Sequence, residues 1–214
     1  MTDKSFWRLA AAAAVIAALA AAIFWPIHPL GWGHPGDPHD AAWFAAVNSP
    51  AYSFAYDVLI LMVVACAVVL SALTPLLAPR VGRWLVWVLP LWLLGLTLLA
   101  SAGVFNGHVA PALAANPATQ AFLDLRGPLL GGPLHGVFAI GGLLFAAANI
   151  VLATVLERSK VFEFPFAAAL AVGAIGIGLH PMLGPVLRSI GFGLFALAYL
   201  RLAVACWRRA TTGM

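Results

Sequence analysis

The 214-residue sequence contains very few charged side chains. Lysine, arginine, aspartate and glutamate together make up 8% of the chain, against about 25% in soluble domains. Apolar residues make up 64%. A helix crosses a bilayer with about 20 mostly apolar residues. The composition therefore excludes a soluble globular domain and predicts an all-α, polytopic membrane helix bundle that forms a single transmembrane domain over residues 1–214.

Reactive sequence motifs are also scarce. The two cysteines, Cys66 and Cys206, lie in apolar stretches and form no CxxC pair, so we expect buried thiols rather than a disulfide framework or a redox centre. No GxSxG nucleophile motif occurs. The net charge is +4, but no basic stripe alternates with aromatic residues, which argues against nucleic-acid binding. These absences do not decide whether the protein is an enzyme.

Six apolar stretches are long enough to be predicted as membrane spans. They lie at about residues 6–25, 52–77, 84–105, 134–156, 164–179 and 186–207. The first stretch also resembles a signal peptide, and we expect it to be retained as a span. Outer loops are expected at about residues 26–51, 106–133 and 180–185, and the first should contain a short helix over residues 40–47 that is capped by Asp40.

The basic residues predict the orientation of these spans. Most of the 11 lysines and arginines fall on one side, where they mark the cytoplasm by the positive-inside rule. These are Lys4, Arg8, Arg80, Arg83, Arg158, Lys160, Arg201, Arg208 and Arg209. Only Arg126 and Arg188 fall on the other side. Both termini are thus expected in the cytoplasm, with the protein in a bacterial inner (plasma) membrane.

This orientation places all six histidines in the outer loops or at the outer helix ends. The sharpest local motif is HisProGlyAspProHisAsp at residues 34–40, which combines two imidazoles with two carboxylates. Such donors suit a transition metal, so His34, Asp37, His39 and Asp40 are candidate ligands. The alternative is a solvated turn, because aspartate, proline and glycine are ordinary turn formers.

A second set of histidines comes from three separate helix ends. His108 follows the third span, His135 begins the fourth and His180 ends the fifth. Three imidazoles at one depth would form a three-histidine metal site with an open position, and two of them would suffice to ligate a haem. The alternative is that all three are interfacial residues, since imidazole suits that layer.

Asp57 is the acidic residue that lies within a predicted span, about one turn from its outer end. A charge at the centre of a spanning helix costs about 2.5–3.5 kcal/mol, so such a residue indicates a functional site and needs a partner. The candidate partners are Arg188 and the three helix-end histidines. Asp57 is then either a catalytic base or a ligand, or it remains solvated at the interface.

Small and polar residues inside the spans predict how the helices pack. Glycines over residues 131–142 and 173–178 should let helices approach closely, and Asn149 should form a hydrogen bond between helices. The segments LeuAspLeuArgGlyProLeuLeuGlyGlyProLeuHisGly (123–136) and GlyAlaIleGlyIleGlyLeuHisPro (173–181) resemble six-span bacterial membrane proteins of a DRAM-like group, over roughly residues 120–207. That resemblance implies a six-helix membrane fold and no particular activity.

The leading functional hypothesis is a histidine and aspartate site on the extracytoplasmic face. It would bind a transition metal, zinc or copper, either as a structural ion or for metal-assisted chemistry on a lipid-like substrate. A b-type haem or quinone electron-transfer protein is the first alternative. A small-molecule or lipid carrier is another, and a scaffold subunit, in a homo-oligomer or a larger membrane complex, is the last. Membrane lipids are expected partners in every case.

Overall fold

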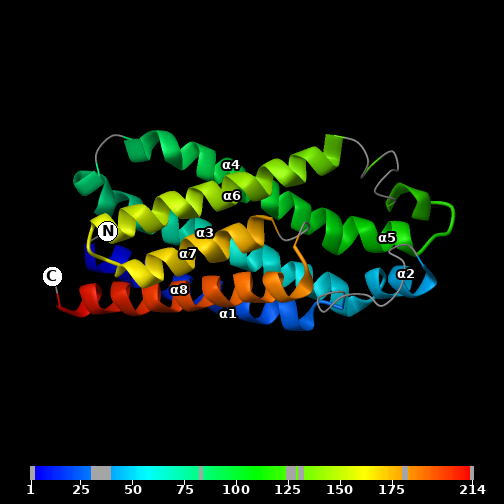
Figure 1. Ribbon diagram of the computed structural model, residues 1–214, viewed down its shortest axis with the longest axis horizontal. Coiled ribbons are helices and arrows are strands. Elements are labelled where there is room, and N and C mark those ends of the chain that lie inside the picture. The colour runs from blue at the N-terminus through cyan, green and yellow to red at the C-terminus, as the bar shows by residue number, and fades with distance from the viewer. Residues whose placement is uncertain are drawn as a thin grey trace.

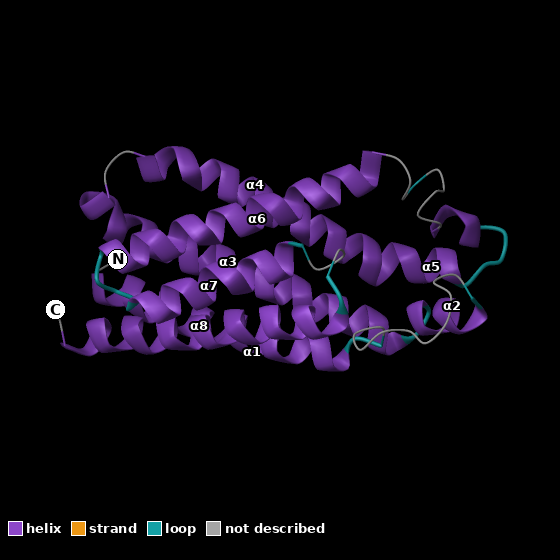
Figure 2. Cartoon of the chain, viewed as in Figure 1, coloured by secondary structure: helices purple, strands orange, loops and turns teal. Residues whose placement is uncertain are grey.

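The computed structural model describes residues 3–29, 40–81, 84–123, 129, 133–179 and 183–212, and its secondary structure is entirely helical (Figure 2). The helices are α1 (Asp3–Ile27), α2 (Ala41–Val47), α3 (Pro50–Val81), α4 (Trp84–Val104), the π-helix η1 (Phe105–Val109), α5 (Ala110–Ala114), the 3₁₀ turn η2 (Gln120–Leu123), α6 (Pro133–Arg158), α7 (Phe164–Gly178) and α8 (Pro185–Thr212).

Five of these helices are long and apolar enough to cross a membrane. They cover Asp3–Ile27, Pro50–Pro79, Leu89–Ala114, Gly136–Arg158 and Pro185–Thr212. The fifth predicted span, residues 164–179, corresponds to α7, which has 15 residues. It is therefore about 22 Å long at 1.5 Å per residue, short of the roughly 30 Å hydrocarbon layer. The fold is thus that of a multi-pass helical membrane protein with five long apolar helices and one short one.

The six main helices form a closed ring. Each packs on two neighbours, in the order α1, α3, α4, α6, α7 and α8, and α8 packs on α1 again. The N- and C-termini lie at the same end of the bundle (Figure 1). We call this the terminal end. The opposite end carries α2, α5 and η2, and we call it the distal end.

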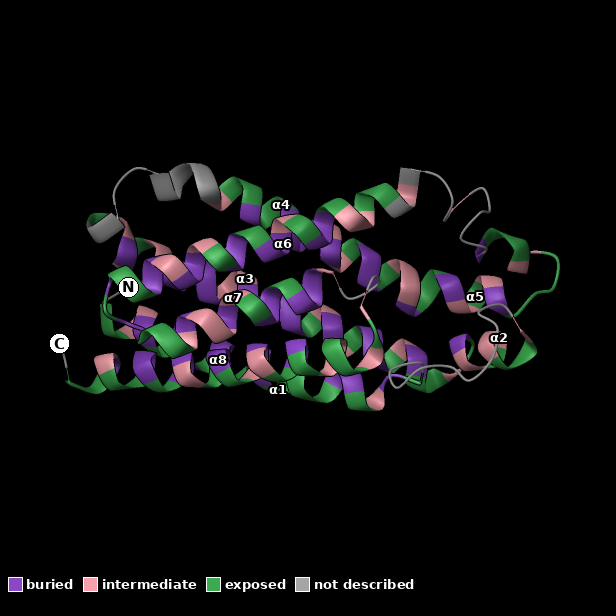
Figure 3. Cartoon of the chain, in the orientation of Figure 1, coloured by how far each residue is buried: buried purple, intermediate pink, exposed green. Residues whose placement is uncertain are grey.

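Alanine and glycine residues set the spacing between the helices of the ring. α1 buries Ala10, Ala14, Ala17 and Ala21 completely or nearly so, because alanine side chains let a helix backbone approach its neighbours closely. The outer faces are apolar and exposed, with leucines such as Leu61, Leu91, Leu143 and Leu197 half exposed (Figure 3). An apolar surface of this kind is what a lipid-facing bundle requires.

A polar contact joins α6 to α8 in the middle of the bundle. The Tyr199 hydroxyl donates to Asn149 Oδ1 at 3.3 Å, and Asn149 Nδ2 donates to the Phe145 carbonyl at 2.9 Å. Both side chains are fully buried. The expectation that Asn149 bonds across helices is therefore confirmed. Cys66 and Cys206 are buried free thiols, as the sequence indicated.

The predicted glycine packing faces are confirmed at the joints between α6, α7 and α8. A Cβ on Gly142 of α6 would overlap the Gly178 carbonyl of α7, and a Cβ on Gly178 would overlap the Gly142 carbonyl. A Cβ on Gly176 would lie 2.7 Å from the Gly191 Cα of α8. The backbones are in direct contact at these positions, so only glycine fits.

The second outer loop begins later than the sequence predicted. Residues 106–114 were expected to be loop because Asn106, Gly107 and Pro111 are helix breakers, but the chain stays helical through η1 and α5 to Ala114. In η1 the Ala110 N–H bonds to the Phe105 carbonyl, five residues back. This wider turn shifts the hydrogen-bond register, and Pro111 then lies in the first turn of α5, where its missing N–H costs little.

Candidate functional site

The distal end of the bundle brings together two of the residues selected from the sequence. His108 Nε2 and Asp57 Oδ1 are 3.0 Å apart, although 51 residues separate them in the chain. Asp57 lies in α3 and His108 in η1. Both side chains are about half exposed, at 53% and 52%. The contact is therefore a solvent-accessible hydrogen bond at the rim of the bundle.

The π-helix explains why these two side chains meet. Gly107 packs directly on α3, where an added Cβ would lie 2.7 Å from the Tyr56 Cβ. The absence of a side chain at Gly107 lets η1 approach α3, and the next residue, His108, then reaches Asp57. π-Helical turns within α-helices occur frequently at functional sites. The local backbone thus positions His108 rather than leaving it on a free loop.

The first turn of α6, which contains His135, lies level with this pair along the bundle. The Phe105 and Phe138 rings are tilted to one another with centroids 5.7 Å apart, and Gly141 lies against Leu98. Because α4 and α6 are antiparallel, residues after Phe105 are level with residues before Phe138. His108 is consequently level with the first turn of α6, which contains His135.

Most of the remaining candidate ligands lie in segments that the structure does not describe. His34, Asp37, His39 and His180 lie outside the described residues. Asp40 caps α2, as expected, because its Oδ1 accepts a hydrogen bond from the Trp43 N–H at 2.7 Å. Within the part of the chain that the structure describes, no three histidine, cysteine or acidic side chains are close enough together to hold a metal ion.

α7 ends at a different depth from the beginning of α6. α7 ends at Gly178, which lies against Gly142, seven residues after His135 along α6. Seven residues correspond to about 10 Å of helix. The end of α7 is therefore deeper in the bundle than the first turn of α6.

The structure gives Asp57 a different partner from Arg188. The Arg188 guanidinium lies over the Trp25 ring at 5.4 Å, and its Nε donates to the Leu183 carbonyl. Asp57 contacts His108 instead. Of the two kinds of partner that the sequence left open for Asp57, a helix-end histidine is therefore the one observed.

A buried aromatic cluster around His28 adjoins the pair and was missed in the sequence. His28 is 8% exposed, and its ring lies 5.1 Å from Tyr52 and 5.3 Å from Tyr56 of α3, and 5.4 Å from Phe24. Phe24 and His28, like Tyr52 and Tyr56, are four residues apart and so share a helix face. This four-residue spacing of aromatic residues was the feature of the sequence that could have revealed the cluster. Tyr56 of this cluster precedes Asp57, so the aromatic packing fixes the part of α3 that presents the carboxylate.

Comparison of the chain with known protein families, with curated proteins and with solved structures gives no match. The functional argument rests on the site itself.

Proposed function

We propose that this protein binds a transition metal ion, zinc or copper, at the distal end of the bundle. The observation that carries the proposal is the contact between Asp57 and His108. Histidines that ligate metals usually give their second ring nitrogen to a carboxylate or a carbonyl, which fixes the ring and raises its basicity. Here Nε2 of His108 faces Asp57, so Nδ1 is the nitrogen that would bind the ion.

His135 supplies the second imidazole in this proposal. Its backbone lies level with His108, on the neighbouring helix of the ring. His180, His34 and His39 lie outside the described residues and remain further candidate ligands, because the sequence predicts them on the same side of the membrane. Two or three imidazoles with an open position suit zinc or copper.

The proposed chemistry follows from the half-exposed position of the pair. A metal ion with an open position lowers the pKa of bound water and can polarise a carbonyl or phosphoryl oxygen. In this arrangement Asp57 would hold the imidazole of His108 in the orientation that binds the ion. Since the surrounding helices have apolar outer faces, the substrate class that reaches this rim most easily is a lipid-like molecule.

Replacing Asp57 by asparagine tests the proposed role of the carboxylate. The neutral amide keeps the shape of the side chain and removes the charge that orients His108. Loss of such an outer partner typically weakens metal affinity about 10–100-fold, and we expect a loss in that range by zinc or copper titration. Glu157→Gln is the matched control, since this exposed carboxylate lies at the terminal end of α6. Equal affinities in wild type and Asp57→Asn would contradict the proposed role.

We further propose that the terminal end faces the cytoplasm of a bacterial cell and that α7 completes a sixth crossing. Both termini lie at one end, which an even number of crossings produces, and this end carries most of the lysines and arginines. The bilayer would be locally thinner beside α7, as occurs where a span is short.

Single cysteines test this orientation, because the two native cysteines are buried and give little background labelling. Ala118→Cys lies in the exposed distal segment and Glu157→Cys at the terminal end. We expect a membrane-impermeant maleimide to label Ala118→Cys in intact spheroplasts and Glu157→Cys only after the membrane is opened. The reverse pattern would show that the protein is oriented the other way.

A further inference from the structure

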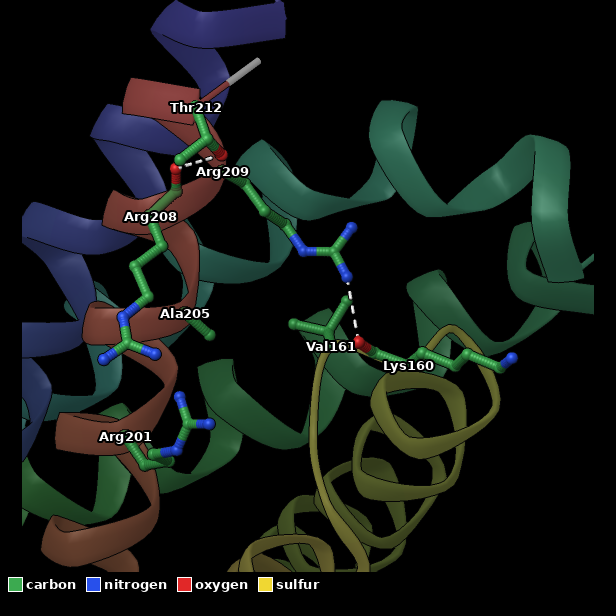
Figure 4. Close-up of a pocket in the computed structure, with 7 residues that line it drawn as sticks. All are labelled: Lys160, Val161, Arg201, Ala205, Arg208, Arg209 and Thr212. Atoms are coloured by element: carbon green, nitrogen blue, oxygen red, sulfur yellow. Dashed lines mark hydrogen bonds between the residues drawn. The ribbon is translucent and has the colours of Figure 1, made fainter. Parts of the chain in front are cut away.

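Polar side chains at the two ends of the bundle form hydrogen bonds of different kinds. At the terminal end, Arg209 of α8 donates to the Lys160 carbonyl at 2.9 Å and so joins α8 to the turn between α6 and α7 (Figure 4). In the distal half of α4, polar side chains donate instead to carbonyl groups of their own helix, four residues back. Thr97 Oγ1 donates to the Leu93 carbonyl at 2.8 Å, and Ser101 Oγ donates to the Thr97 carbonyl at 2.9 Å. Contacts of this second kind act on the backbone of a single helix.

Asn106 forms a third contact of this kind, at the point where α4 continues into the π-helix η1. Its Nδ2 donates to the Ala102 carbonyl at 2.8 Å, and the side chain is partly buried. Within η1, the Ala110 N–H bonds to the Phe105 carbonyl, five residues back. The spacing of the backbone hydrogen bonds therefore changes from four residues to five beside Asn106. Asparagine side chains compete with the backbone for nearby carbonyl groups, which is why they favour irregular turns over regular helix.

The wider turn determines the direction in which His108 points. It contains one residue more than an α-helical turn, so its conversion into regular helix would rotate the positions that follow by about 100°. His108 is the fourth of the five residues of η1 and would undergo most of this rotation. Its contact with Asp57, at 3.0 Å, would then be broken. Gly107 lets η1 approach α3, but glycine permits many conformations and does not by itself select the wider turn.

We propose that Asn106 is a positioning residue that keeps His108 against Asp57. Its amide holds the Ala102 carbonyl, this contact stabilises the wider turn, and the turn directs the imidazole to the carboxylate. Asn106 and His108 are two residues apart and do not share a helix face, so Asn106 acts through the backbone and is not itself a ligand. The effect on a bound metal ion rests on the proposed function, whereas the effect on the contact between His108 and Asp57 does not.

Asn106→Leu and the smaller replacement Asn106→Ala both remove the donor. His108 should then lose its carboxylate partner, and zinc or copper affinity should fall about 10–100-fold, as in Asp57→Asn. The losses should not add in the double variant Asp57→Asn/Asn106→Leu, because both changes remove the same contact. Asn106→Ser should restore wild-type affinity, since a serine hydroxyl forms the equivalent hydrogen bond at Ser101. Ser101→Ala is the matched control: it removes one such bond from the regular part of α4 and should leave the affinity unchanged.

A nitrogen NMR spectrum of the histidine rings in metal-free protein tests the proposal without a metal. The His108 signal is assigned by its absence in His108→Gln, and it reports the hydrogen bond that the ring makes. We expect Asp57→Asn, Asn106→Leu and Asn106→Ala to shift this signal alike, and Asn106→Ser and Ser101→Ala to leave it in place. An unchanged signal in Asn106→Leu and Asn106→Ala, or an equal shift in Ser101→Ala, would overturn the role of Asn106. The expected shifts without any change in metal affinity would support that role and contradict the metal site.

Discussion

Replacing Gly142 by alanine is expected to destabilise the bundle by about 1–3 kcal/mol, the range for a substitution that overpacks a tight core. The added methyl group would overlap the Gly178 carbonyl of α7. Backbone atoms cannot rotate away as a side chain can, so α6 and α7 must move apart along their whole contact. The same reasoning applies to Gly178→Ala, whose methyl group would meet the Gly142 carbonyl.

Gly193→Ala is the matched control for this experiment. Gly193 lies in α8 with nothing within 4 Å of an added Cβ, and alanine is the better helix former by about 1 kcal/mol. Thermal unfolding in detergent, followed by circular dichroism, should therefore show a large decrease in Tm for Gly142→Ala and no decrease for Gly193→Ala. Similar Tm values for the two variants would show that α6 and α7 are not in backbone contact.

The double replacement of His108 and His135 by alanine is expected to abolish metal binding. In the proposed site these two imidazoles are the ligands that come from helices of the ring, and the remaining donors belong to connecting segments. Removing both leaves no ligand from a helix of the ring, because Asp57 contacts the His108 imidazole rather than the ion in the proposed site. The metal content of the purified variant should decrease from about one ion per chain to background.

Val109→Ala provides the control for the π-helix itself. Val109 is exposed, lies next to His108 in η1 and has no metal-binding atom. It should retain the metal and unfold at nearly the wild-type temperature. Full metal content in the histidine double variant would remove these residues from the site, and equal loss in Val109→Ala would show that the backbone rather than the imidazoles was responsible.

The helices could be predicted well from the sequence, because a long apolar stretch in a membrane must satisfy its own backbone hydrogen bonds and a helix does so within one segment. Asp40 illustrates a correct local prediction: an aspartate before an apolar segment accepts from the backbone N–H three residues on, and it caps α2 as expected. α7 was harder. Its 15 residues are apolar enough for a span but end at the level of Gly142, and the depth of a helix end depends on its neighbours rather than on its own sequence.

The contact between Asp57 and His108 could be anticipated only as one of several pairings. A charge in an apolar helix needs a partner, and that argument selected Arg188 and three histidines equally. The choice depends on the π-helix, and nothing in PheAsnGlyHisVal distinguishes a wider helical turn from the beginning of a loop.

Elemental analysis of the detergent-purified wild-type protein, combined with an absorption spectrum, tests the central proposal most directly. We expect about one zinc or copper ion per chain and no Soret band, with the ion lost in the His108 and His135 double variant. A Soret band would instead indicate bound haem and an electron-transfer protein. A colourless protein that contains no metal, and takes up none when zinc or copper is supplied, would contradict the proposed function.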